Sequence, residues 1–190
     1  MKRRQALWGI ALLGAGSMAI SGFKWINWYK RPDLIYIHRQ KDLLAALTET
    51  IIPTTDTPGA IEAGVPEFVL KMVLENTGTP SQNRFIDGLK AIDPYSLEHF
   101  GKPYVKCSRE QQNEIMRHFE QDGKPFDGIP GKVQRKLIGN SFFTTLKEYT
   151  CIGYFTSMVG ATQALAYVFT PGIYQGCVPL QPGQKAWAIR

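Results

Sequence analysis

The sequence lacks the short, clustered motifs that most cofactors and metals require. Its cysteines and histidines are few and far apart along the chain: Cys107, Cys151, Cys177, His38, His99 and His118. The missing Cys-x-x-Cys-His motif excludes c-type haem attachment. Three scattered thiols do not supply the four thiolates of an iron–sulfur cluster, and the spacing does not fit a zinc site. We therefore expect no cofactor or metal in this chain, and surface or packing roles for its histidines.

The sequence also lacks nucleotide-binding and hydrolase signatures, and it has no long run of like charge. Neither Gly-x-Gly-x-x-Gly, nor a phosphate-binding loop, nor Gly-x-Ser-x-Gly occurs. The formal net charge is +6, and half of it comes from the first four residues. The densest remaining cluster, at 132–136, is typical of a solvated helix face, so nucleic acid is not an expected partner.

What the chain does have is a basic tip followed by an apolar run. Arg3 and Arg4 precede Leu7 and a glycine-containing apolar stretch at 6–23. This pattern is typical of an export signal, and the paired arginines favour the twin-arginine route, which carries folded proteins. A general secretory signal remains open. So does retention as a membrane anchor, because the 18-residue run lies near the lower limit of about 17–25 for a membrane span.

We therefore predict a periplasmic protein with three parts. Residues 1–22 form the export signal, 23–40 an irregular aromatic leader, and 41–190 one helical domain. An oxidising compartment favours disulfides, and the odd number of cysteines leaves two pairings open. Either Cys151, expected to be buried, pairs with the more accessible Cys177, or Cys177 or Cys107 links to another chain.

Apolar spacing predicts several helices in the first two thirds of the chain. The first spans 42–52 and ends before Pro53, and the second begins at Pro66 after a short turn at 60–63. The third begins at Ser81 or Gln82 and ends before Pro94. Ser108 and Gln111 form a capping box that begins a fourth helix, which runs to about 121.

The longest predicted helix covers 132–158, with Gly139 and Gly153 as points where it kinks or splits. After Gly160 the chain is rich in glycine, proline and aromatic residues, and we expect a long irregular C-terminal tail. The fold class predicted is mainly α, a single helical domain. Four aromatic residues of the tail are candidates for a partner interface, with packing on their own domain as the alternative: Tyr167, Phe169, Tyr174 and Trp187.

Asp56, Glu148 and Tyr149 are the polar side chains that are candidates for a chemical role. Asp56 lies among threonines before Pro58, where it either binds a cation or acts as a base, or else accepts backbone N–H bonds and fixes the turn. Glu148 and Tyr149 are candidates for polar partners in a cleft. Neither position has a second acid or a histidine near it in sequence, so we expect no catalytic residue in this chain.

Residues 47–60 (LTETIIPTTDTPGA) and 63–66 (AGVP) resemble the opening of the gluconate 2-dehydrogenase subunit 3 family. Residues 153–157 (GYFTS), 160–161 and 171–180 (PGIYQGCVPL) resemble its C-terminal part. The resemblance covers nearly all of the chain after the signal, and the first of these segments is its most specific part.

The resemblance implies a small, non-flavin subunit of a periplasmic sugar or polyol dehydrogenase. The implied partner is a large flavoprotein of the glucose–methanol–choline type, which carries FAD and the catalytic groups and often passes electrons to a c-type cytochrome. That large subunit commonly lacks a signal and travels with the small one. Membrane association is then expected only through the N-terminal segment or the complex. The alternatives are a free-standing periplasmic helical binding or structural module and an enzyme in its own right.

Overall fold

The computed structural model describes residues 30–124, 139–170, 172–173, 176–177, 179–180 and 182–188. The predicted export signal, with Arg3, Arg4 and Leu7, lies outside these ranges, and so do Tyr174 and the start of the long predicted helix at 132–138. The described part consists of helices joined by loops, and no β-strand occurs within it. This confirms the mainly α fold class.

The elements follow one another in a simple order. The α-helices, in chain order, are α2 (Leu34–Arg39), α3 (Lys41–Ile51), α4 (Val65–Glu75), α5 (Thr79–Phe100), α6 (Arg109–Asp122) and α8 (Phe142–Thr156). A short 3₁₀ helix, η1 (Tyr104–Lys106), lies between α5 and α6. A π-helical turn, η2 (Gly160–Ala164), follows α8.

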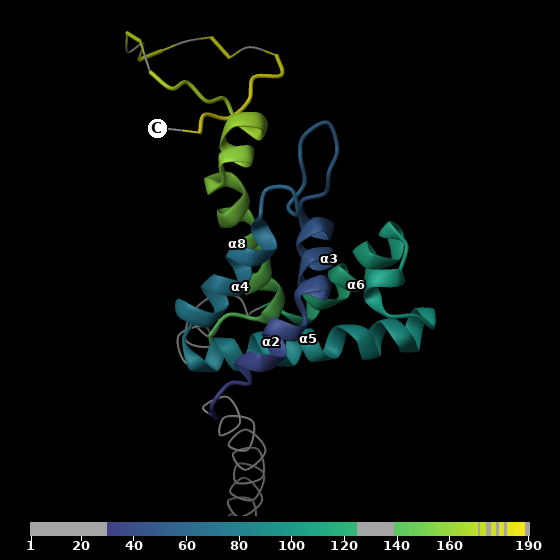
Figure 1. Ribbon diagram of the computed structural model, residues 1–190. Coiled ribbons are helices and arrows are strands. Elements are labelled where there is room, and N and C mark those ends of the chain that lie inside the picture. The colour runs from purple at the N-terminus through teal and green to yellow at the C-terminus, as the bar shows by residue number, and fades with distance from the viewer. Residues whose placement is uncertain are drawn as a thin grey trace, which may run out of the picture.

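Helix α5 forms a base on which α3, α4 and α8 stand (Figure 1). The upper end of α8 and η2 extend beyond the other helices, and the C-terminal tail lies beyond them. The first described residues, before α2, lie at the opposite end of the molecule. Helix α8 makes its most extensive contacts with α4 and α5. The described fold therefore has a helical body and a C-terminal end that projects from it.

The core lies where α3, α4, α5 and α8 meet, and apolar side chains from all four helices fill it. The largest side chains that are fully buried are Tyr104, Phe85, Ile37, Leu44, Leu47, Leu89, Ile92, Ile115, Leu146, Val65, Val69 and Val73. The hydroxyl of Tyr104 lies 2.8 Å from Thr50 Oγ1, and the backbone N–H of Tyr104 donates to Asp93 Oδ1 at 3.0 Å. Burial, only partly offset by the Thr50 hydrogen bond, raises the pKa of Tyr104 well above its usual range.

Two helical glycines allow α8 to pack closely against its neighbours. A Cβ atom on Gly88 of α5 would overlap Cβ and Cγ of Phe142, the first residue of α8. A Cβ atom on Gly153 of α8 would lie 2.6 Å from Cδ1 of Phe68 on α4. Each phenylalanine ring therefore occupies space that only a glycine leaves open, and α8 is fixed at both ends.

The first helices match their predicted ranges closely. Helix α3 ends at Ile51, α4 has Pro66 in its first turn, and the capping box of Ser108 and Gln111 begins α6, as predicted. The predicted leader was expected to be irregular, and this is wrong for its last part. Asp33 accepts a hydrogen bond from the Tyr36 N–H at 3.1 Å and begins α2, whose Ile37 is buried in the core.

The prediction for the third helix is wrong at both ends. Helix α5 begins at Thr79, because Pro80 suits a first helical turn, and it continues through Pro94 to Phe100. A proline inside a helix costs about 3 kcal/mol. Beyond the proline, the buried Ser96 ties the helix to the following turn, because its hydroxyl donates to the Lys102 carbonyl at 2.7 Å. Gly101, with φ of +68°, ends the helix in the left-handed region.

The described part of the long predicted helix becomes helical only at Phe142, after Gly139, one of the two glycines named as points of interruption. Gly139 has φ of +82°, and Ser141 caps α8 by accepting from the Thr144 N–H at 3.3 Å. The Gly139 carbonyl accepts from Nη1 of the part-buried Arg84 at 2.6 Å. Gly153, in contrast, lies inside an unbroken α8, and the longest described helix is α5, with 22 residues.

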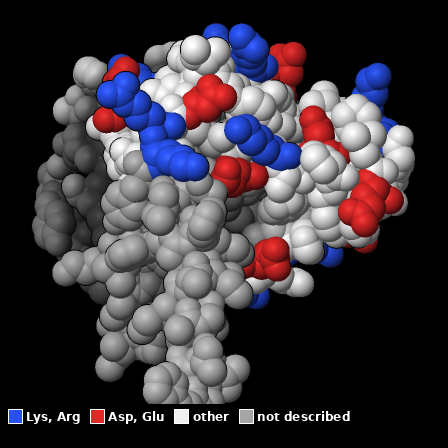
Figure 2. Space-filling model, turned by 90° about the horizontal axis from the view of Figure 1, so that it is seen from below, with Lys and Arg blue, Asp and Glu red and all other residues white. Residues whose placement is uncertain are grey.

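Charged side chains of both signs are interspersed on the face seen from below (Figure 2). Among the described residues, no helix has both the length and the apolar character needed to cross a membrane.

The close contact at Gly88 leads to a stability prediction. We expect Gly88→Ala to lower the free energy of unfolding by about 1–3 kcal/mol, because the overlap with Phe142 outweighs the better helix propensity of alanine. Urea unfolding followed by circular dichroism measures this. Gly172→Ala, where a Cβ would meet nothing within 4 Å, is the matched control. Equal stability of the two variants would contradict the role given to Gly88.

Candidate partner-binding surface

The polar residues singled out in the sequence do not come together. Asp56 is exposed, and its carboxylate accepts a hydrogen bond from the Thr55 hydroxyl at 2.9 Å. Glu148 accepts from the side-chain amide of Asn140 at 3.3 Å. The Tyr149 hydroxyl lies 2.9 Å from Thr77 Oγ1, and Glu148 is not part of that contact. These groups have separate structural partners, and none is arranged as an acid–base pair.

The carboxylate that fixes the turn after α3 belongs to Glu49, not to Asp56 as the sequence suggested. Glu49 Oε1 accepts from the Thr54 N–H at 2.8 Å and from the Thr54 hydroxyl at 2.7 Å. Glu49 Oε2 accepts from the Ile61 N–H at 3.0 Å. We call this the Glu49 clamp. Apolar spacing does not predict this clamp, because its three hydrogen bonds depend on the path of the loop after α3.

The clamp explains two further residues of the same segment. A Cβ atom on Gly59 would overlap the Glu49 carboxylate and the Thr54 hydroxyl, so only glycine lets the loop close over the acid. From the other side, the hydroxyl of the buried Tyr154 on α8 donates to the Pro58 carbonyl at 2.7 Å. The loop at 53–60 is therefore tied to both α3 and α8.

The hydrogen bonds of the clamp favour the ionised form of the Glu49 carboxyl group. Partial burial alone would raise the pKa of its carboxyl group. The hydrogen bonds from Ile61 and Thr54, with a smaller contribution from the charge of Arg109, outweigh burial and leave that pKa below its usual value.

Two of the three histidines, expected to be isolated, share one tyrosine. The Tyr95 ring stacks on His99 with centroids 3.9 Å apart and on His118 with centroids 4.3 Å apart. The arrangement joins α5 to α6 and is consistent with the packing roles expected from the sequence. Within the described ranges, no group of three histidine, cysteine or acidic side chains is placed to hold a metal ion.

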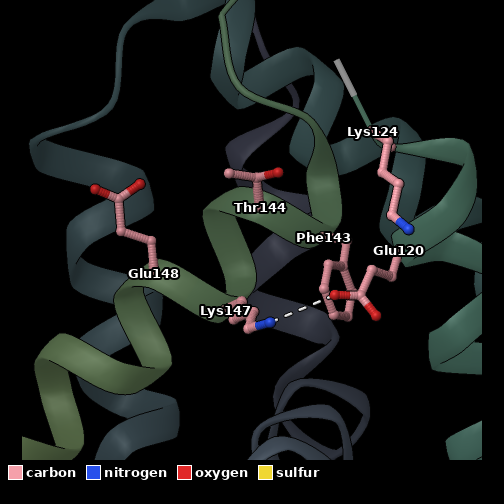
Figure 3. A pocket seen from close by; sticks show the side chains of 7 residues that line it. Glu120, Lys124, Phe143, Thr144, Lys147 and Glu148 are labelled. Atoms are coloured by element: carbon pink, nitrogen blue, oxygen red, sulfur yellow. Dashed lines mark hydrogen bonds and ion pairs between the residues drawn. The ribbon is translucent and has the colours of Figure 1, made fainter. Parts of the chain in front are cut away.

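A hollow of about 420 Å³ lies between α6 and α8 (Figure 3). Its lining residues are Glu120, Gly123, Lys124, Phe143, Thr144, Lys147 and Glu148. Lys147 pairs with Glu120 at 3.4 Å and lies over the Phe143 ring, 5.6 Å from its centroid. Both members of the ion pair are about half exposed, so this hollow offers a solvated ion pair over one aromatic ring.

The three cysteines are free thiols in this structure. Cys107 is buried, with its sulfur 3.1 Å from Ser96 Oγ, and Cys177 is exposed, as its position in the tail predicted. Cys151, expected to be buried, is only partly so. The Cys151–Cys177 bridge is therefore not formed here, and a link to another chain stays a prediction.

Large apolar side chains gather in the C-terminal part of the chain and remain exposed. The exposed fractions are 80% for Met158, 86% for Phe169, 93% for Ile173, 86% for Leu180 and 56% for Trp187. Tyr167, another predicted interface residue, is also exposed. A soluble monomer rarely leaves so many apolar side chains uncovered in one region, which marks this region as a candidate interaction surface.

The end of the described tail lies beside its beginning, where Ala166 bonds to the segment at 186–188. The Ala166 N–H donates to the Ala186 carbonyl at 2.8 Å, and the Ala188 N–H donates to the Ala166 carbonyl at 2.9 Å. These bonds form a parallel bridge between Ala166 and Trp187. We call the described residues of the range 167–186 the C-terminal loop, and Figure 1 shows them beyond η2.

Comparison with family models matches residues 38–172 to the family described as gluconate 2-dehydrogenase subunit 3. The chain belongs to this family. Searches of curated proteins and of solved structures gave no match. As the name subunit 3 indicates, the chain is one component of a multi-subunit dehydrogenase. The range matched to the family includes the Glu49 clamp and Tyr154, and it ends inside the C-terminal loop.

The clamp leads to a pH-dependent prediction. At neutral pH, Glu49→Gln should lower the free energy of unfolding by about 1–3 kcal/mol, because one amide cannot accept from both Thr54 and Ile61. The folded-state pKa of Glu49 lies below the unfolded value of about 4.3. Its contribution is therefore complete above that value and is lost as the pH falls through the folded pKa.

Urea unfolding at neutral and acid pH tests this. The difference between the wild-type protein and Glu49→Gln should shrink as the pH is lowered below about 4. Glu62→Gln, at an exposed glutamate of the neighbouring turn, is the matched control and should change stability by less than about 0.5 kcal/mol. A difference of the same size at every pH would refute the clamp.

Proposed function

We propose that this chain is the non-catalytic small subunit of a periplasmic, FAD-dependent sugar or gluconate dehydrogenase. In this proposal it binds a large flavoprotein of the glucose–methanol–choline type and accompanies it through twin-arginine export. The FAD and the catalytic groups belong to the large subunit, and a c-type cytochrome is a further candidate partner. The observation that carries the proposal is family membership as subunit 3, over most of the chain.

The exposed C-terminal region supports a binding role. Among the described residues from Met158 onward, seven large apolar side chains are exposed, and they include Phe169, Ile173 and Leu180. Apolar and aromatic side chains of this kind are typical of the central part of a protein–protein interface.

The export role rests on the N-terminal sequence. Arg3 and Arg4 precede a mildly apolar run, and the route that such pairs favour carries proteins that are already folded. Since this chain shows no cofactor motif, the passenger that requires folding before export is the partner with its FAD. The small subunit then supplies the export address for both.

The first test is purification of the tagged chain from the periplasm of its host. We expect a large subunit with a flavin absorption spectrum to be purified with it. Arg3→Lys together with Arg4→Lys should leave both chains in the cytoplasm. Arg31→Lys with Arg39→Lys, at two exposed arginines after the signal, is the matched control and should leave export unchanged. A colourless single chain at normal yield would instead favour a free-standing periplasmic module.

The exposed thiol leads to a second prediction. If a cysteine links the two subunits in the oxidising periplasm, it is Cys177, because Cys107 is buried against Ser96. Gel electrophoresis without reductant should then show one band with the combined mass, and reductant should separate it. Cys177→Ser should remove this band and Cys107→Ser should not. A combined band that survives Cys177→Ser would contradict the assignment.

A further inference from the structure

We propose that the C-terminal loop binds the large subunit as a preformed unit, and that the partner surface it covers is apolar and uncharged. This inference rests on the proposed function, because it takes a protein subunit as the occupant. Three observations carry it: the closure of the loop, the charge pattern of the last 42 residues, and the position of the loop in the fold.

The loop is closed and anchored before any partner binds. Two backbone hydrogen bonds at Ala166 hold its ends together, and Lys185 Nζ donates to the Gln163 carbonyl of η2. The element η2, which precedes the loop and accepts the Lys185 bond, is in turn held against the end of α8. Ser157 Oγ accepts from the Gly160 N–H at 2.9 Å, and a Cβ on Gly160 would overlap the Tyr154 carbonyl. A segment closed in this way loses less conformational entropy on binding than an open tail of equal length.

The charge pattern defines the chemistry of the partner surface. Glu148 is the last acidic residue, and from 149 to 190 the only charged side chains are Lys185 and Arg190. Lys185 is already bonded to Gln163. A cation on the partner would lose its water here and find no acidic side chain, and a carboxylate would find only Lys185 and Arg190, so burying charge here is unfavourable. The exposed side chains of the loop, led by Phe169, Ile173 and Leu180, match an apolar surface instead.

A membrane surface fits these observations less well than a protein does. Segments that bind membranes peripherally combine apolar side chains with several lysines or arginines for the lipid headgroups. The described part of the loop has one lysine, and that lysine is bonded to the fold. The first described residues, before α2, lie at the end of the molecule opposite the loop (Figure 1).

The test measures binding of the full-length chain to the FAD-containing large subunit that is purified with it. Phe169→Glu with Leu180→Glu places two charges on exposed loop positions, and it should raise Kd at least about tenfold. Ile35→Glu makes the same kind of change at a position of α2 that is 67% exposed and should change Kd less than about twofold. Wild-type Kd should change less than about twofold between 0.05 and 0.5 M salt, because no ion pair is screened.

A second variant tests the closure. Ala166→Pro removes the N–H that donates to Ala186, and Leu165, with ψ of 165°, already has the extended backbone that precedes a proline. We expect Kd to rise about fivefold while the melting temperature of the helical domain is unchanged. An unchanged Kd in Ala166→Pro would overturn the preformed loop.

The possible failures are separable. If no flavin-containing subunit binds the wild-type chain, the proposed function fails. If the large subunit binds wild-type and doubly charged chains equally, the proposed function stands and the loop is not the binding element. If the double variant binds the large subunit normally but no longer binds vesicles of phosphatidylethanolamine and phosphatidylglycerol, the loop binds membranes and the inference is overturned.

Discussion

Two phenylalanine rings pressed against glycine backbones determine where α8 lies. Phe142 packs on Gly88 of α5, and Phe68 of α4 packs on Gly153. With both ends held, α8 closes the core on one side and carries its own C-terminal end beyond the other helices (Figure 1). This packing sets the position of α8 and η2, and the contacts at Ala166 and Lys185 hold the C-terminal loop, with its exposed apolar surface, against them.

The molecule has two ends of different character. Charges of both signs are interspersed on the described part of the face seen from below (Figure 2), whereas the C-terminal end has many apolar side chains and few charges. Between them, the Glu49 clamp and Tyr154 tie the loop at 53–60 to α3 and α8. The segment with the most specific family resemblance thus supports the helix that presents the binding surface. Family membership as subunit 3 and the exposed surface agree on a role in binding another subunit.

The sequence predicted correctly those helices whose positions depend on residues close to one another along the chain. Apolar spacing located α3 and α4, and the Ser108 capping box located the start of α6, because each depends on neighbours within one or two turns. The predictions from the sequence were wrong where contacts between residues far apart along the chain determine the structure. Helix α5 continues through Pro94 to the buried Ser96, which bonds to the Lys102 carbonyl, and Glu49 takes the role assigned to Asp56. Exposure of the tail aromatics was one of two open alternatives, since composition does not distinguish a covered side chain from an uncovered one.

The Ala166 bridge separates the closure of the C-terminal loop from its side chains. Because two backbone hydrogen bonds close the loop, its closure does not depend on which side chains lie between its ends. Exposed side chains such as Phe169 and Leu180 can therefore be replaced without opening the loop or disturbing the helical body. The shape of this surface and its chemistry can in this way be changed independently.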